Sequence, residues 1–157
     1  MTDAMPTARI TVPTPLGPFV IREVDGRIVS AGWSDTSPDG VPTPLLAEAA
    51  AQLQAYFSRS LREFDLPVAP GGDPFDQAVW EEMRRIPYGG TATYGELGRR
   101  LGGDPRLVGV ACSRNPIPVI IPCHRVVARE GRTGGYSGRG GVETKSFLLA
   151  LEGALLI

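Results

Sequence analysis

The sequence predicts an α/β protein of two lobes, a small N-terminal lobe with an antiparallel sheet at 1–70 and a mainly helical C-terminal lobe at 73–157. Short apolar runs broken by proline and glycine fill the first part of the chain, as expected for strands joined by turns. A second proline- and glycine-rich stretch at 66–72 indicates the boundary, and short helical patterns follow it. With 157 residues and 42% hydrophobic content, the chain can bury roughly 68–70% of its unfolded surface.

Three antiparallel strands are expected in the N-terminal lobe. Residues 13–18 separate the first two apolar runs with prolines and a glycine. Asp25-Gly26, a dipeptide typical of tight hairpin turns, separates the last two. The three apolar runs are residues 10–12, 19–21 and 28–31.

Helix starts are marked by capping residues. Thr43, Asp73 and Asp104 each precede a proline, which is favourable at the first helical position. Thr93 followed three residues later by Glu96 is a capping-box pattern. The expected helices cover about 44–60, 74–86, 94–101, 106–113 and 145–152, the last capped by Gly153.

Two of these helices form a recognisable pair. The helices at 94–101 and 106–113 are joined by a turn containing Gly102-Gly103, which resembles a helix-turn-helix. An apolar strand at 117–121 is expected to follow and to lead directly to Cys123.

Composition excludes several classes of protein. Two cysteines and one histidine suggest neither a disulfide framework nor a four-ligand zinc site, so no metal or other cofactor is expected. The N-terminus lacks the basic and apolar regions of a signal peptide, and no apolar run is long enough to span a bilayer. A cytoplasmic protein with no membrane partner is therefore expected.

The overall net charge of -1 hides a division between the two halves of the chain. Residues 1–79 carry a net charge of -5, whereas residues 80–157 carry +4, nearly all of it from arginine. Arginine suits contacts with phosphates and bases, although most charged faces of proteins are simply solvated.

Cys123 and His124 stand together behind an apolar run, and His124 is the only histidine. A thiol with a pKa of about 8.5 needs a nearby base or positive charge to react as a thiolate at neutral pH. Adjacent side chains in extended structure point to opposite faces, so His124 is expected to act through a bridging water or a bent backbone. A buried, inert cysteine is the alternative for Cys123, and it is the preferred interpretation for Cys112.

The C-terminal half resembles one family, the O6-alkylguanine-DNA alkyltransferases, also called methylated-DNA-protein-cysteine methyltransferases. The most specific segment is 115–126, Asn-Pro-Ile-Pro-Val-Ile-Ile-Pro-Cys-His-Arg-Val. The N-terminal lobe matches only around 14–18. The other matching segments are residues 75–80, 86–89, 93–97, 135–138 and 148–152.

The resemblance implies a single-turnover protein that flips O6-alkylguanine out of duplex DNA and transfers the alkyl group irreversibly to Cys123. O4-alkylthymine is a second implied substrate, and a monomer is expected. The implied fold is a ribonuclease-H-like N-terminal lobe and a winged-helix-like C-terminal lobe.

The resemblance also implies a role for each site residue. Cys123 is the nucleophile, His124 the base acting through a water, and Glu152 the carboxylate that orients His124. Asn115 braces the turn beneath the site, and Tyr94 donates a proton to the departing guanine and helps to rotate the nucleotide. From the residues alone, a surface charge near a helix end is the preferred interpretation of Glu152.

Further residues are implied in DNA binding and in the lesion pocket. Arg106 is the finger that takes the place of the flipped base, and it belongs to a DNA-binding set with Tyr94, Arg114 and Arg125. The alternative interpretation of these arginines is that they are simply solvated, and the alternative for the pocket residues is an ordinary glycine-rich loop. The expected lining of the pocket is Tyr136, Ser137 and Val126.

The sequence departs from the family pattern in two places. The segment between Tyr94 and Arg106 is about two residues shorter, with Asp104 and Leu107 where the family has small neutral residues. The loop after Tyr136 is about two residues longer and contains Arg139. An acidic side chain such as Asp104 near phosphates opposes DNA binding.

Three functions from different classes remain open on the sequence. The first is a suicide DNA-repair alkyltransferase. The second is a non-catalytic lesion-binding protein of the alkyltransferase-like kind, which the presence of Cys123 disfavours. The third is a cysteine hydrolase or redox thiol, which leaves the helix-turn-helix and the basic half unexplained.

Overall fold

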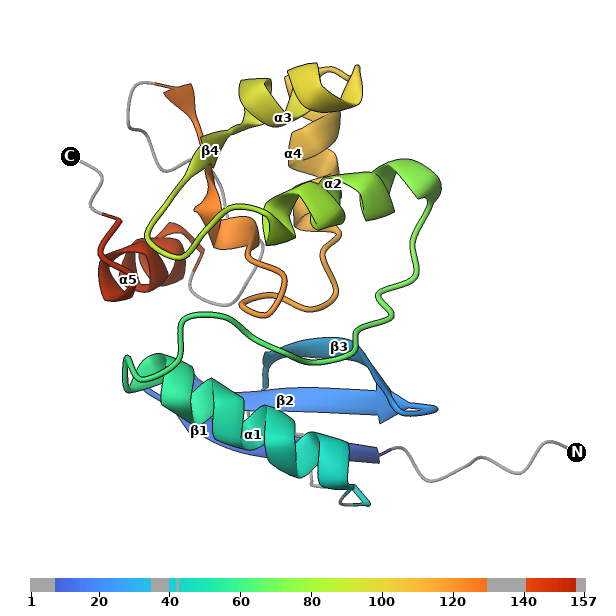
Figure 1. Cartoon of the computed structure of the whole chain (residues 1–157), viewed down its shortest axis with the longest axis vertical. Helices are drawn as coiled ribbons and strands as arrows, with labels where there is room; N and C mark the ends of the chain where they lie inside the picture. The colour runs from blue at the N-terminus through green and yellow to red at the C-terminus, as the bar shows by residue number, and fades with distance from the viewer. Residues whose placement is uncertain (1–7, 35–39, 42, 130–140, 155–157) are drawn as a thin grey trace, which may run out of the picture. The chain divides into compact units, whose positions relative to one another are not determined.

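The N-terminal unit is a three-stranded antiparallel sheet covered by one helix (Figure 1). The computed structural model describes residues 8–34, 40–41, 43–129 and 141–154. Strands β1 (Ala8–Thr14), β2 (Gly17–Val24) and β3 (Arg27–Trp33) lie in chain order, and helix α1 (Pro44–Phe57) packs on β1 and β2. Asp25 and Gly26 both have positive φ, 51° and 77°, as a two-residue type I′ hairpin requires.

Helix α1 begins where the capping pattern predicts. The Thr43 hydroxyl accepts a hydrogen bond from the Leu46 amide at 3.1 Å, and Pro44 occupies the first helical position. The helix ends at Phe57, earlier than expected, because Arg59 adopts a left-handed φ of 67°. Its buried face carries Leu46, Ala49, Leu53 and Tyr56.

The proline-rich stretch that follows joins the sheet for a short distance. The Ile28 amide donates to the Pro67 carbonyl at 2.9 Å, and the Ala69 amide donates to the Ile28 carbonyl at 2.8 Å. This bridge belongs to the first of two compact units, Met1–Pro70 and Gly71–Ile157.

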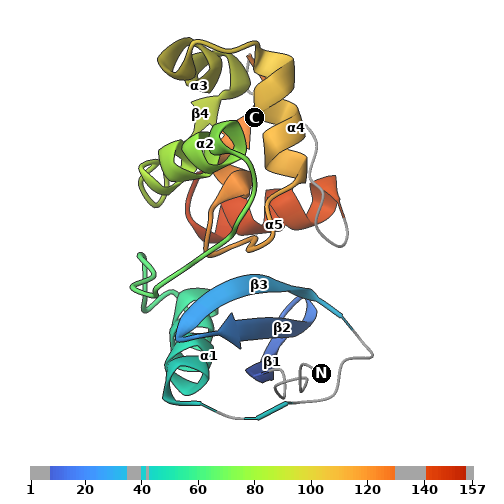
Figure 2. The same ribbon diagram turned by 90° about the vertical axis from the view of Figure 1, so that its right-hand side faces the viewer.

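The second unit is mainly helical (Figure 2). Its central helices are α2 (Pro74–Arg84), α3 (Tyr94–Leu101) and α4 (Pro105–Ser113), and Trp80 of α2 donates its indole N–H to the Ala111 carbonyl of α4 at 2.9 Å. Two-residue strands β4 (Ala92–Thr93) and β5 (Val126–Val127) pair in parallel. The remaining elements are the 3₁₀ turn η1 (Cys123–Arg125) and helix α5 (Val142–Leu151).

Helices α3 and α4 form the expected helix-turn-helix with a tight turn. The capping box of Thr93 and Glu96 is present, and Gly102 ends α3 with a φ of 67°. A side chain at Gly98 would place its Cβ 2.7 Å from the Gly103 carbonyl oxygen, so glycine is required for the close approach of the turn. Asp104 caps α4 by accepting from the Arg106 amide at 2.8 Å.

The expected strand at 117–121 is wrong. This segment is a buried turn, in which the Ile121 amide donates to the Ile117 carbonyl at 2.9 Å and Val119 has a φ of 73°. Pro116 and Pro118 have no amide hydrogen to donate, so the segment cannot supply a full ladder of strand hydrogen bonds. Its apolar side chains are buried because the turn enters the core.

Helix α5 is longer than expected at its start and ends with a Schellman motif. The Ala154 amide donates to the Leu149 carbonyl at 2.8 Å, and the Gly153 amide donates to the Ala150 carbonyl at 3.0 Å. Val127, Leu149 and Ala154 form a small apolar cluster around this end. Among the residues that the structure describes, no helix is both long and apolar enough to cross a membrane.

Candidate active site

The turn η1 brings Cys123, His124 and Arg125 into the core of the C-terminal unit, and all three are buried. The Cys123 amide donates to the Ile121 carbonyl at 2.8 Å, and the Arg125 amide donates to the Pro122 carbonyl at 3.0 Å. The backbone is therefore bent at Cys123 rather than extended, which removes the strict alternation of neighbouring side chains.

Asn115 holds the turn that precedes Cys123. Its Nδ2 donates to the Ile121 carbonyl at 2.9 Å, and its Oδ1 accepts from the Ile117 amide at 3.0 Å. Burial raises the pKa of the Cys123 thiol, while a hydrogen bond from Asn115 and the charge of Lys145 oppose that rise. Asn115 thus fixes the backbone of the turn that carries Cys123.

His124 and Glu152 are joined across 28 residues of sequence. The His124 Nε2 lies 2.7 Å from Glu152 Oε2, and both side chains are completely buried. Burial raises the pKa of Glu152, but hydrogen bonds and charge from His124 and Arg125 outweigh it and lower the pKa to about 2. Because the carboxylate can only accept, Nε2 carries the hydrogen of the neutral imidazole.

This hydrogen bond leaves the other ring nitrogen of His124 as the basic one. Burial lowers the pKa of His124, and the charges of Arg125 and Lys145 lower it further against the opposing effect of Glu152. The ring is therefore neutral at neutral pH. Its Nδ1 is buried and has no hydrogen-bond partner within the described ranges, so it is placed to accept a proton.

Arg125 was expected to bind DNA, and the structure corrects this. Its Nε and Nη2 donate to the two carboxylate oxygens of Glu152 at 2.8 and 3.0 Å, and its Nη1 donates to the Ile86 carbonyl at 2.8 Å. The guanidinium is buried and committed to this bidentate pair, so it holds Glu152 and is not exposed to a phosphate.

Tyr94 lies at the start of α3 beside a lysine that the sequence did not identify as a site residue. The Lys145 Nζ donates to the Tyr94 hydroxyl oxygen at 3.3 Å, and it lies 5.5 Å from the centroid of the ring. Burial, followed by the proximity of the Cys112 and Cys123 thiols, raises the pKa of Tyr94 to about 12. The hydroxyl is therefore protonated at neutral pH.

A periodic signal could have identified Lys145 from the sequence. Lys145, Leu148, Leu149 and Glu152 follow helical spacing, and all four are buried on one face of α5. A lysine and a glutamate on an otherwise apolar helical stripe are seldom buried without a partner. Glu152 entered the site only through the family resemblance.

The remaining expected residues are exposed, buried in a strand, or outside the described residues. The Arg106 side chain is 90% exposed at the start of α4 and pairs with Asp104 at 3.1 Å, and the exposed Arg114 lies 3.5 Å from Asp76. Val126 is buried in β5. Tyr136 and Ser137, like Arg139, lie outside the described residues.

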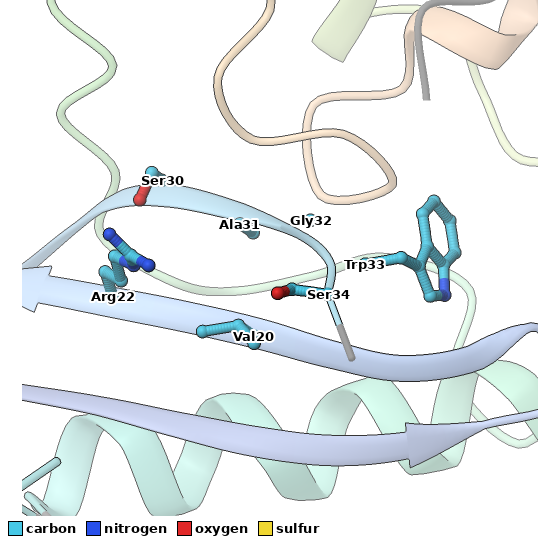
Figure 3. A pocket seen from close by; sticks show the side chains of 7 residues that line it. All are labelled: Val20, Arg22, Ser30, Ala31, Gly32, Trp33 and Ser34. Carbon is cyan, nitrogen blue, oxygen red and sulfur yellow. The ribbon is translucent and has the colours of Figure 1, made fainter. Parts of the chain in front are cut away.

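The N-terminal unit has a cavity of about 190 Å³ on the β2–β3 face of its sheet (Figure 3). None of the site residues lines it, and it contains no thiol, imidazole or carboxylate that could carry nucleophilic or acid–base chemistry. Its lining residues are Val20, Arg22, Ser30, Ala31, Gly32, Trp33 and Ser34.

The low pKa of Glu152 predicts a loss of stability in acid. The pKa is about 2 in the folded protein against an ordinary 4.5, so the stabilising effect is complete above pH 4.5 and is lost as the pH falls from 4.5 towards 2. We expect the temperature of thermal unfolding to fall across this interval, and to fall less in Glu152→Gln, which has no carboxylate to protonate. Equal decreases in the two proteins would contradict this assignment.

The fold and the site together define a two-unit protein with a buried cysteine, a neutral histidine base and a helix-turn-helix. Two family descriptions match this chain: "6-O-methylguanine DNA methyltransferase, DNA binding domain" at residues 74–154, and the ribonuclease-like domain of the same family at residues 9–70. The second match covers the N-terminal lobe well beyond 14–18, where the sequence alone indicated the resemblance.

Curated relatives and solved structures agree with these matches. A constitutive methylated-DNA–protein-cysteine methyltransferase of Bacillus subtilis is 38% identical over 154 residues, covering 90% of this chain and 93% of its own length. A protein of the same name from Methanosarcina acetivorans is 47% identical over 109 residues, covering 68% and 69%. The Mycobacterium tuberculosis protein OGT, solved in complex with DNA, superposes with a TM-score of 0.83 at 36% identity, covering 94% and 93%.

The chain belongs to the methylated-DNA–protein-cysteine methyltransferase family. Its activity is that of a direct-reversal DNA-repair methyltransferase, and DNA is its partner.

Proposed function

We propose that this chain removes the alkyl group from O6-alkylguanine, and from O4-alkylthymine, in duplex DNA by transferring it irreversibly to Cys123. The protein acts as a monomer in the cytoplasm, and each molecule acts once. The observation that carries the proposal is the buried series Glu152, His124 and Cys123, in which the only histidine keeps a basic nitrogen beside the thiol-bearing turn.

The groups in the site account for each proton and electron pair that moves in the transfer. The Cys123 proton passes through a water to His124 Nδ1, and the thiolate attacks the alkyl carbon. A new S–C bond forms as the C–O6 bond breaks, and the electron pair of that bond remains on the guanine. Tyr94, whose pKa of about 12 keeps it protonated, donates a proton to the departing base. The thioether product has no leaving group that would regenerate the thiol, so the protein is consumed.

In this proposal the C-terminal lobe at 73–157 binds DNA and contains the acceptor cysteine. The α/β lobe at 1–70 supports the C-terminal lobe. Arg106 enters the base stack in place of the flipped nucleotide, which its high exposure at the start of α4 permits. Arg114 contributes a phosphate contact. Tyr136, Ser137 and Val126 line the lesion pocket.

The test is mass spectrometry of the protein after mixing with a duplex that contains one O6-methylguanine. We expect one added methyl group per molecule, on the peptide that contains Cys123, and none in Cys123→Ser. Cys112→Ser is the matched control and should be methylated like the unaltered protein. DNA binding without modification of Cys123 would instead indicate a non-catalytic lesion sensor.

A further inference from the structure

The loop between α2 and β4 runs beside the C-terminal end of α5 (Figure 1). Its residues 87–90 form a tight turn, in which the Gly90 amide donates to the Pro87 carbonyl at 2.9 Å. Gly89 has a φ of 82°, as the third residue of a type II turn requires, and Tyr88 is the second residue. The transfer described above gives this turn no part, so the position of its one large side chain needs an explanation from its contacts.

Tyr88 contacts both segments that carry the buried ion pair of Arg125 and Glu152. The centroid of its ring lies 5.9 Å from Arg125 Cζ, within the range of a cation–π interaction. Its hydroxyl donates to the carbonyl of Leu151, the residue before Glu152, at 3.3 Å. One side chain therefore touches the guanidinium and also fixes the end of the helix that carries the carboxylate.

The residues that flank Tyr88 contact the same ion pair. The Ile86 carbonyl accepts from Arg125 Nη1 at 2.8 Å. A Cβ added at Gly89 would lie 3.2 Å from the Glu152 carbonyl oxygen, closer than most Cβ atoms approach another atom, so the backbone of the turn packs directly against the end of α5. The segment 86–89 is thus a continuous support for the pair.

The ion pair in turn determines the charge of the His124 ring. Glu152 lies 2.7 Å from His124, and two hydrogen bonds from Arg125 neutralise the carboxylate. Burial lowers the pKa of His124, Glu152 opposes this shift, and the charge of Arg125 adds to it. Displacement of the guanidinium would therefore raise the pKa of His124. A protonated ring cannot accept the proton of Cys123.

Helices α2 and α5 pack against η1 and carry other charged groups. On α5, the charge of Lys145 also lowers the pKa of His124. On α2, the buried carboxylate is Asp76, which pairs with Arg114 at 3.5 Å. Replacement of Tyr88 leaves all of these groups in the chain, so a change in the titration of the histidine reports on the ion pair that the tyrosine touches.

We propose that Tyr88 is a positioning residue of the alkyl transfer: it holds the Arg125–Glu152 pair in place, and so keeps the histidine base neutral. This proposal rests on the proposed transfer to Cys123. The ring shields the guanidinium from water, which would otherwise compete with the carboxylate for its hydrogen bonds. The hydroxyl fixes the end of α5, and with it the carboxylate that orients the imidazole.

The test compares Tyr88→Leu with the unaltered protein by NMR titration of the imidazole. His124 is the only histidine, so its ring signals are unique in the spectrum. Leucine removes both the aromatic face and the hydroxyl, and we expect the titration of the ring to move to higher pH. Methyl transfer in acid solution should then slow about tenfold for each unit by which the pKa rises. The rates should converge in alkaline solution, where the ring is neutral in both proteins.

Three further variants separate positioning from the filling of space. Tyr88→Phe keeps the aromatic face over Arg125 and loses only the hydroxyl, so it should restore most of the original titration. Tyr88→Met fills part of the space with a flexible apolar side chain, and it replaces Tyr88→Leu if that variant does not fold. Phe147→Leu is the matched control, because this ring is 38% exposed on α5, and it should leave the titration unchanged.

An unshifted or lowered titration of His124 in the folded Tyr88→Leu protein would overturn the proposal, whatever the thermal stability of the variant. An equal shift in Phe147→Leu would also overturn it. A shift to higher pH that Tyr88→Phe largely reverses, together with slower methyl transfer in acid solution, would support it. Failure of the unaltered protein to accept a methyl group would reject the proposed function instead, and the NMR titration distinguishes the two failures because it requires no DNA.

Discussion

Replacement of Glu152 by alanine is expected to lower the free energy of unfolding by about 3–5 kcal/mol, the range for removing one partner of a buried ion pair. The carboxylate accepts from His124 at 2.7 Å and from two guanidinium nitrogens of Arg125. Without it, Arg125 is left as a buried cation whose one remaining side-chain hydrogen bond, among the residues that the structure describes, is to the Ile86 carbonyl. This residual charge, and not the lost contact alone, makes the effect large.

Urea unfolding followed by circular dichroism measures this change. Glu143→Ala is the matched control, because Glu143 lies exposed on the same helix, and exposed substitutions usually change stability by no more than about 0.5 kcal/mol. A loss below about 1 kcal/mol in Glu152→Ala would show that Arg125 finds another partner or reaches water.

Replacement of His124 by glutamine is expected to slow methyl transfer about 10²–10⁴-fold at neutral pH, the usual contribution of a general base. The glutamine amide can still donate to Glu152, so the buried carboxylate keeps a partner. It has no basic nitrogen to replace Nδ1, which is the ring atom without a partner in the described part of the chain. The thiol then loses its proton acceptor while the fold is retained.

Single-turnover kinetics with a methylated duplex measure this rate, and thermal unfolding checks that the variant is folded. The variant should regain part of its rate in alkaline solution, where the thiol ionises without a base. A loss smaller than tenfold in a folded His124→Gln protein would remove His124 from the role of base.

Features determined by neighbouring residues were predicted well from the sequence. The hairpin at Asp25-Gly26, the capping box of Thr93 with Glu96, and the N-caps at Thr43 and Asp104 all occur as expected. Each depends on the backbone preferences and hydrogen bonds of a few adjacent residues, which no distant contact alters here. The α/β class was accessible for the same reason, whereas the nucleophilic role of Cys123 stays a prediction.

Tertiary structure decided the features that join distant segments. The apolar segment 117–121 looked like a strand, but two prolines and the Asn115 side chain make it a buried turn. Arg125 looked like a DNA contact, but the burial of Glu152 recruits it into the core. The position of Lys145 beside Tyr94 depends on how α5 packs against α3, since the two residues are 51 positions apart.

The sequence by itself predicted the family of this chain, the chemistry that we propose for the Cys123-His124 pair, and where most helices begin. Only the tertiary structure decided which charged side chains lie beside the residues of the site. Local turns and caps are stabilised by contacts within a few residues, whereas a buried charge is tolerated only where folding supplies its partner, and those partners lie 27 to 51 residues away in the chain.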